Sequence, residues 1–121
     1  EDWFVRSMVA YNPKAPIAVL TELSRDENEK VRVEVAGNPK TPIEVLTELS
    51  KDKYWKVRRE VAENPATPAK ILEQLSEDED EVRSAVAGNP RTPPAVLTEL
   101  SKDEDEWNVQ KAARDNLSFP K

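Results

Sequence analysis

The residues of this sequence that could do chemistry are almost all carboxylates and guanidinium groups, because it contains neither histidine nor cysteine. Histidine is the commonest general base near neutral pH, and cysteine supplies thiol nucleophiles and thiolate metal ligands. Paired carboxylates for hydrolysis would need a cleft and two different environments, and nothing in the sequence indicates one. We therefore expect that this protein is not an enzyme.

Three acidic runs on predicted linkers could offer oxygen ligands to calcium. They are residues 26–29, 77–81 and 103–106. None of them has the EF-hand spacing with its central glycine. A solvated, mutually repelling edge that aids solubility is the favoured interpretation, and we expect neither a metal nor a cofactor.

Aspartate and arginine recur in register along the chain, five or six residues apart. The pairs are Asp26 and Arg32, Asp52 and Arg58, and Asp78 and Arg83. One interpretation is a charged strip that grips a peptide or an anion. The favoured one is structural: the acid caps the following helix and pairs with arginines of its own or the next copy.

An Asn-Pro pair marks each copy of the repeated unit. The asparagines Asn12, Asn38, Asn64 and Asn89 are 26, 26 and 25 residues apart, and Asn116 follows 27 residues later without its proline. A fixed period of this size is typical of a solenoid, and the asparagines suit turns between elements. We predict one domain over residues 1–121, made of a trailing half-repeat at 1–12, repeats at 13–38, 39–64, 65–89 and 90–116, and a tail at 117–121.

Each unit has two apolar stripes at helical spacing. Thr41-Pro42 predicts the start of a helix of about ten residues, with the hydroxyl as cap and proline in the first turn. Ile43, Leu46 and Leu49 form its stripe. A second element of about eight residues, α-helical or 3₁₀, begins at Val31, Val57 and Val82. Such short helices are marginal alone, so the units must bury their stripes against one another.

The repeated pattern Val-Arg-x-x-Val-Ala-x-Asn-Pro-x-Thr-Pro-x-x-Leu-Leu-x-x-Leu resembles the variant leucine-rich repeat family over residues 5–116. The resemblance implies an all-α, right-handed, HEAT-like solenoid of about four repeats without a β-sheet, and it supplies no catalytic residues. Some members carry a cysteine-ligated iron–sulfur cluster, which a chain without cysteine cannot hold. In the last copy Gln110 and Arg114 replace the usual arginine and alanine, as an end cap requires.

The candidate partner-binding residues are those that vary within the fixed framework. They are Val33, Glu34, Arg59, Glu60 and Ser84, together with Trp55. If the second elements line a concave side, the variable residues face a partner; surface drift is the alternative. Trp3, Trp55 and Trp107 occupy one repeat position, where packing is favoured over an exposed binding anchor.

These observations favour a non-enzymatic scaffold for protein or peptide interaction. A net charge of −6 disfavours nucleic acid, which needs a basic face. No run of apolar residues could cross a membrane, and the cytoplasm is the default location. The chain starts with Glu1 inside a repeat, which suggests a fragment or an engineered protein. The alternative function is thus a designed or consensus-like repeat protein without a native ligand. The partner's identity and the oligomeric state do not follow from the sequence.

Overall fold

The computed structural model describes residues 2–103 and 106–118, and in these residues the chain is helical without strands. Part of the acidic run at 103–106 and the end of the predicted tail lie outside the described residues. The helices are α1 (Trp3–Tyr11), α2 (Ile17–Leu23), α3 (Glu29–Gly37), α4 (Ile43–Leu49), α5 (Trp55–Glu63), α6 (Ala69–Leu75), α7 (Asp80–Gly88), α8 (Pro94–Leu100) and α9 (Trp107–Ser118). The all-helical prediction is confirmed.

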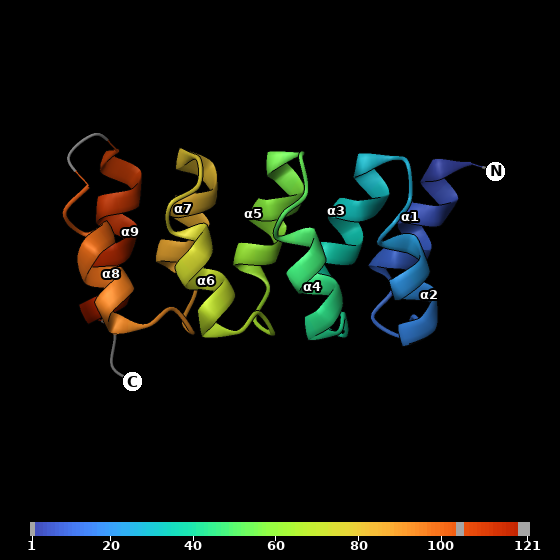
Figure 1. Ribbon diagram of the computed structural model, residues 1–121, viewed down its shortest axis with the longest axis horizontal. Coiled ribbons are helices and arrows are strands. Elements are labelled where there is room, and N and C mark those ends of the chain that lie inside the picture. Colours follow the sequence, from blue (N-terminus) through green and yellow to red (C-terminus); the bar gives the residue numbers. More distant parts are fainter. Residues whose placement is uncertain (1, 104–105, 119–121) are drawn as a thin grey trace.

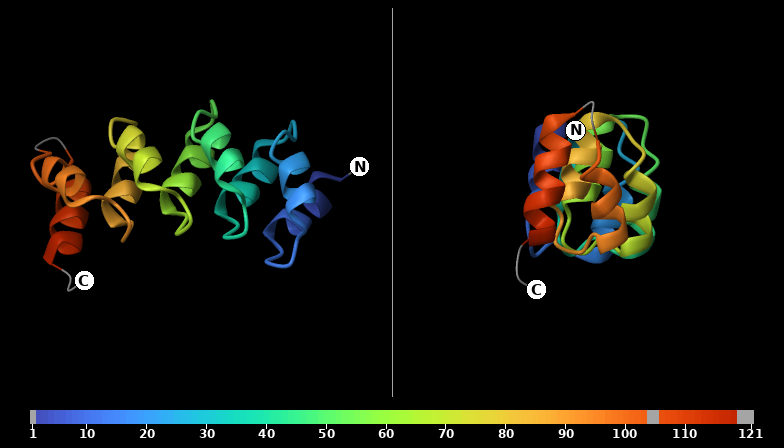
Figure 2. Two further views of the ribbon diagram at one scale, coloured as in Figure 1. Left: turned by 60° about the horizontal axis from the view of Figure 1, so that its bottom comes forward. Right: turned by 90° about the vertical axis from the view of Figure 1, so that its left-hand side faces the viewer.

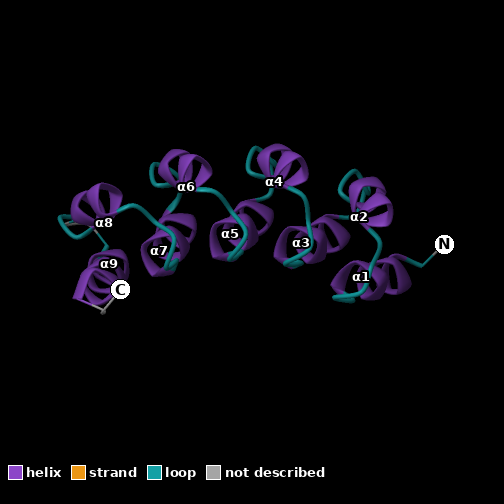
Figure 3. Cartoon of the chain, turned by 90° about the horizontal axis from the view of Figure 1, so that it is seen from below, coloured by secondary structure: helices purple, strands orange, loops and turns teal. Residues whose placement is uncertain are grey.

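The helices form one elongated array (Figure 1), which is curved and has two layers (Figure 3). The odd-numbered helices lie on the inner, concave side and the even-numbered helices on the outer side, as seen along the layers in Figure 3. Each odd-numbered helix packs against the next one, from α1 to α9. The left-hand view of Figure 2 shows the same succession of helix pairs from end to end, and the right-hand view looks along the array. The arrangement is that of a helical repeat solenoid.

The predicted relative lengths of the two elements are wrong. The first helix of each unit, expected to span about ten residues, has seven, as in α4. The second element, expected to be the shorter one and α or 3₁₀, is a nine-residue α-helix in α3, α5 and α7. The inner layer therefore carries the longer helices.

The role predicted for the threonine before each proline is also wrong. Pro42 itself occupies the N-cap position of α4 with extended backbone, and no side chain caps that helix. The Thr41 hydroxyl instead donates to the carbonyl of Val35, at 2.6 Å. Carbonyls in the last turn of a helix lack intrahelical donors. The threonine therefore completes the end of the preceding helix, and it does so while buried.

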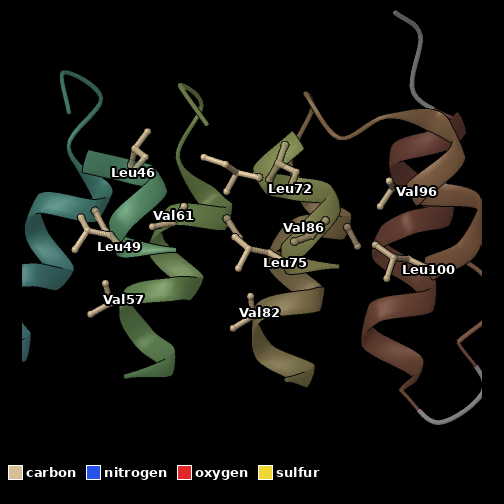
Figure 4. Packing of buried hydrophobic residues seen from close by; sticks show 14 of the residues in the cluster. Leu46, Leu49, Val57, Val61, Leu72, Leu75, Val82, Val86, Val96 and Leu100 are labelled. Carbon is tan, nitrogen blue, oxygen red and sulfur yellow. The ribbon is translucent and has the colours of Figure 1, made fainter. Parts of the chain in front are cut away.

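The core is a continuous row of apolar side chains between the two layers (Figure 4). The outer helices contribute one fully buried leucine per unit, and the inner helices contribute pairs of valines one turn apart. These residues are Leu20, Leu46, Leu72 and Leu97, and Val31, Val35, Val57, Val61, Val82 and Val86. Ile43, predicted to join this stripe, is 54% exposed, and its counterpart Ile17 is 58% exposed, because the stripe begins two residues later.

No helix in the described part of the chain is long and apolar enough to cross a membrane.

Candidate binding surface on the concave face

The recurring arginines and aspartates join successive repeats. Arg32 Nε donates to Asp52 Oδ2 at 2.7 Å, while its Nη1 donates to the backbone carbonyl of Asp26 at 2.8 Å. The same pairing, between side chains twenty residues apart in the sequence, links Arg6 to Asp26, Arg58 to Asp78 and Arg83 to Asp103. The predicted pairing of each aspartate with an arginine of its own or the next copy is therefore wrong, because the aspartate pairs with the arginine of the preceding copy.

The aspartate of each of these inter-repeat pairs also accepts a backbone hydrogen bond. Asp52 Oδ1 accepts from the N–H of Tyr54, the residue just before α5, at 2.9 Å. Hydrogen bonding from Arg6 holds the pKa of Asp26 below its ordinary value, although burial opposes the shift. With both carboxylate oxygens engaged inside the protein, these groups have little capacity left for an external anion or peptide.

The asparagines form a second set of inter-repeat contacts. Asn64 Nδ2 donates to the carbonyls of Ala36 at 2.7 Å and Asn38 at 3.1 Å, both in the preceding repeat. Its Oδ1 accepts from the N–H of Ala66 at 2.9 Å. Asn38 and Asn89 make the same contacts, and all three are buried. The sequence predicted their turn role; their reach into the previous repeat was not predicted.

The variable residues all lie on inner helices and are half-buried. Val33 and Glu34 are on α3, Arg59 and Glu60 on α5, and Ser84 on α7. Burial raises the pKa of Glu34, and burial together with the charge of Glu63 raises the pKa of Glu60. The charge of Glu34 also contributes to raising the pKa of Glu60. The ionised form of both glutamates is therefore less favourable on this face than in water.

Arg59 is the one basic residue among these candidates. Its Nη2 lies 3.4 Å from Glu60 Oε2, and its guanidinium lies over the ring of Trp55, 5.3 Å from the centroid. Its Nε is buried, and no group of the described residues forms a hydrogen bond with it. Trp55 is half-buried and packs against the core beside Tyr54. A buried donor left unpaired costs free energy.

One groove on the concave face is aromatic and apolar. We call it the aromatic groove; it has a volume of about 520 Å³ and lies between α1 and α3, next to the start of α5. It is lined by Trp3, Phe4, Ser7, Met8, Tyr11, Lys30, Val33, Glu34, Tyr54 and Lys56. Phe4, Met8 and Tyr11 are 55%, 53% and 66% exposed. Exposed apolar side chains gathered in one hollow are typical of an interaction site.

A second groove, farther along the same face, is acidic. We call it the acidic groove; it has a volume of about 710 Å³ and lies across α5, α7 and α9. It is lined by Arg59, Glu63, Asp80, Glu81, Ser84, Ala85, Gly88, Asn89, Pro90, Glu106, Asn108 and Val109. The charge of Asp80 raises the pKa of Glu106, which reflects the density of negative charge there. In the described residues no cluster of acidic side chains is arranged to hold a metal ion.

Sequence reasoning missed most of the aromatic groove. A detectable signal was present, because Phe4 and Tyr11 stand where other copies have charged or very small residues. The counterparts of Phe4 include Lys30 and Lys56, and those of Tyr11 include Gly37 and Glu63. Of the three tryptophans, Trp55 is packed, whereas Trp3 and Trp107 are 38% and 66% exposed. Only Trp3 lines the groove.

The fold, the arginine–aspartate pairs and the asparagine hydrogen bonds between repeats define a helical repeat protein whose units are joined by side-chain contacts. The family model of the Leucine Rich Repeat Variant domain matches residues 56–115, and the resemblance drawn from the sequence is confirmed.

One solved structure, described as "a leucine-rich repeat variant with a novel repetitive protein structural motif", is 28% identical to this chain with a TM-score of 0.45. The match covers all of this chain and 62% of that one, so the chain spans less than two thirds of its length. A comparison with curated proteins finds no match.

Proposed function

We propose that this chain is a non-catalytic repeat scaffold whose concave face binds a segment of another protein. The observation that carries the proposal is the aromatic groove, where Phe4, Met8 and Tyr11 are more than half exposed in a solvent-facing hollow. Exposed apolar groups of this size gain free energy when a partner covers them, at about 25 cal/mol per Å². The partner therefore contributes an apolar anchor to this groove.

The acidic groove is the second binding site for the partner segment. Glu63, Asp80, Glu81 and Glu106 present carboxylates there, and only Arg59 among the lining residues is basic. Charge complementarity favours lysine or arginine in the partner, which would speed association and set its direction along the face. Neighbouring inner helices are about 8–10 Å apart in such packing, so two to three helix spacings separate the grooves by about 20–25 Å. An extended segment of about seven residues covers that distance.

The test uses synthetic twelve-residue peptides with a Phe-Leu pair at one end and three lysines about seven residues away. Binding is measured by fluorescence anisotropy of a labelled peptide. We expect the lysine peptide to bind more tightly than a matched peptide with glutamates in place of the lysines, and the difference to shrink as salt increases. Equal affinity for the two peptides would contradict the charge assignment.

Met8→Glu and Ile43→Glu are the matched variants. Both residues are about half exposed, Met8 in the aromatic groove and Ile43 on the outer helix α4. We expect Met8→Glu to weaken peptide binding at least tenfold and Ile43→Glu to leave it unchanged. If no apolar-basic peptide binds, the alternative of a designed or consensus-like repeat protein without a ligand is favoured.

A further inference from the structure

One repeat position of the inner helices lines the concave grooves from α1 to α9. It is the residue directly before the first valine of the repeated pattern, and its occupants are Phe4, Lys30, Lys56, Glu81 and Asn108. The first three line the aromatic groove, and the last two line the acidic groove. The framework around this position is fixed, whereas the residue type changes from apolar to basic to acidic along the array. This position therefore sets the charge that each repeat presents to a partner.

Internal helix packing places this position in the aromatic groove. Ser7 and Met8 of α1 line the groove together with their counterparts one repeat later, Val33 and Glu34 of α3. The same repeat positions of two successive helices thus form its walls. The groove lies between repeats on the concave side, and α5 adds Lys56 to its rim.

The two lysines of this position lie over neighbouring rings. Lys30 Nζ is 4.7 Å from the centroid of the Trp3 ring, and Lys56 Nζ is 5.7 Å from that of Trp55. Both lysines are exposed, and neither takes part in the ion pairs formed among the described residues. An ammonium group over a ring still has N–H donors for an anion. The lysines are therefore placed to bind a carboxylate that a partner supplies.

The aromatic groove is basic in an otherwise acidic protein. Lys30 and Lys56 outnumber Glu34, the one carboxylate among the described residues that line it. The net charge of the chain is −6, and the acidic groove on the same face has the opposite sign. The concave face thus changes from basic to acidic along the array.

We propose that the position before the first valine selects a partner segment with a fixed order of side chains: an apolar anchor, then an acidic residue, then a basic end. This inference rests on the proposed function and adds the acidic residue, which contacts Lys30 and Lys56. Neighbouring inner helices are about 8–10 Å apart, and an extended chain rises about 3.3 Å per residue. Successive repeats therefore meet partner residues about three apart, and the acid lies about three to six residues from the anchor.

The test modifies the twelve-residue peptides that carry a Phe-Leu pair at one end and three lysines at the other. Two adjacent residues, about four positions from the phenylalanine, are aspartate in one peptide, asparagine in the second and lysine in the third. Fluorescence anisotropy measures binding to the parent chain. We expect the aspartate peptide to bind about fivefold more tightly than the asparagine peptide. The overall field of the protein predicts the opposite order, because a chain of net charge −6 attracts the more basic peptide.

Charge reversal assigns the preference to the two lysines. We expect the double variant Lys30→Glu with Lys56→Glu to bind the lysine peptide about fivefold more tightly than the aspartate peptide. The control is Lys51→Glu with Lys70→Glu, which changes the net charge by the same amount. Lys51 and Lys70 are exposed and line neither groove. The control should keep the preference for aspartate.

The outcomes separate this inference from the proposed function. Equal binding of the aspartate and asparagine peptides to the parent would overturn the inference and leave the proposed function standing, because the apolar and basic ends still bind. The same loss of preference in both double variants would also overturn it, since overall charge would then be the cause. If none of the peptides binds the parent, both fail together.

Discussion

Asn64 makes three hydrogen bonds with one side chain, one of them local and two reaching the preceding repeat. Replacing it by alanine leaves the buried carbonyl of Ala36 without this donor. We expect Asn64→Ala to lower the free energy of unfolding by about 2–3 kcal/mol, since each lost bond is worth about 1 kcal/mol and an unpaired buried carbonyl adds to the loss. Chemical denaturation followed by circular dichroism measures the change.

Asn12→Ala is the matched control for that substitution. Asn12 makes the local bond, to the N–H of Lys14, at the same 2.9 Å length as in Asn64. It has no preceding repeat in the described structure to bond, so its loss should cost less than 1 kcal/mol. The difference between the two variants isolates the bonds that cross the repeat boundary. Equal costs would mean that the asparagines act only within their own turns.

Glu60 carries a second prediction at this scale. Its side chain is 24% exposed, and burial and the charge of Glu63 raise its pKa against the opposing effect of Arg59. A carboxyl whose pKa is higher in the folded than in the unfolded state binds its proton more tightly when folded. Its contribution to stability therefore improves as pH falls through the folded pKa, and its charge is unfavourable at neutral pH.

We expect Glu60→Gln to stabilise the protein at pH 7 by up to about 1 kcal/mol and to lose this advantage as pH approaches 4. Urea unfolding of the variant and the parent at both pH values measures the difference, in which the acid sensitivity of Asp26 and the other shared groups cancels. Glu48→Gln, at an exposed position of α4, serves as control. A difference that grew towards low pH would show that pairing with Arg59 outweighs burial.

At the scale of the element, the connection from each inner helix to the next outer helix depends on a buried threonine. Thr67 Oγ1 donates to the carbonyl of Val61, in the last turn of α5, at 2.6 Å, and the residue is completely buried. Valine has the same shape without the donor. We expect Thr67→Val to destabilise the protein by about 1–2 kcal/mol, because that helix end loses a donor that water cannot replace.

Thr47→Val tests the same chemical change in a solvent-accessible place. The Thr47 hydroxyl donates to the carbonyl of Ile43, four residues earlier in α4, at 2.8 Å. That carbonyl lies at an exposed position, so water can take over and the cost should be within about 0.5 kcal/mol. Thermal unfolding of both variants provides the comparison. A large loss at Thr47 with none at Thr67 would contradict the role assigned to the buried hydroxyl.

The elements also show what the sequence can predict. The 26-residue period and the apolar stripes were sufficient for the helices, their order and the valine core, because these depend on local spacing. The pairing of each arginine with the aspartate twenty residues later was not predicted, since Arg32 lies only six residues after the nearer aspartate, Asp26. Thr41 was misassigned for a similar reason: its hydroxyl bonds a carbonyl of the previous helix, and propensity rules describe only the helix that follows.

At the scale of the whole molecule, curvature decides which surface can recognise a partner. Inner helices pack on one another along the concave side, and their variable residues and both grooves share that face (Figure 3). The sequence alone could not predict which helices line the concave side, because the curvature of a stack depends on small rotations between repeats. The aromatic groove likewise depends on α1 and α3 lying side by side, which single-repeat patterns do not describe.

A stack whose units contact only their neighbours should lose stability locally when an end unit is damaged and globally when a central one is. Leu20 in α2 and Leu72 in α6 are both completely buried and occupy the same repeat position. Truncation to alanine costs about 3–5 kcal/mol at such a site. We expect Leu72→Ala to lower hydrogen-exchange protection in α3, α5 and α7 together, because it divides the array.

Leu20→Ala should reduce protection in α1 and α2 while α5 and α7 keep theirs, since the remaining repeats still cover one another. Native-state hydrogen exchange at a fixed low urea concentration resolves the two patterns helix by helix. A uniform loss of protection from Leu20→Ala would mean that the repeats fold as one cooperative unit. The independence of neighbouring interfaces would then have to be abandoned.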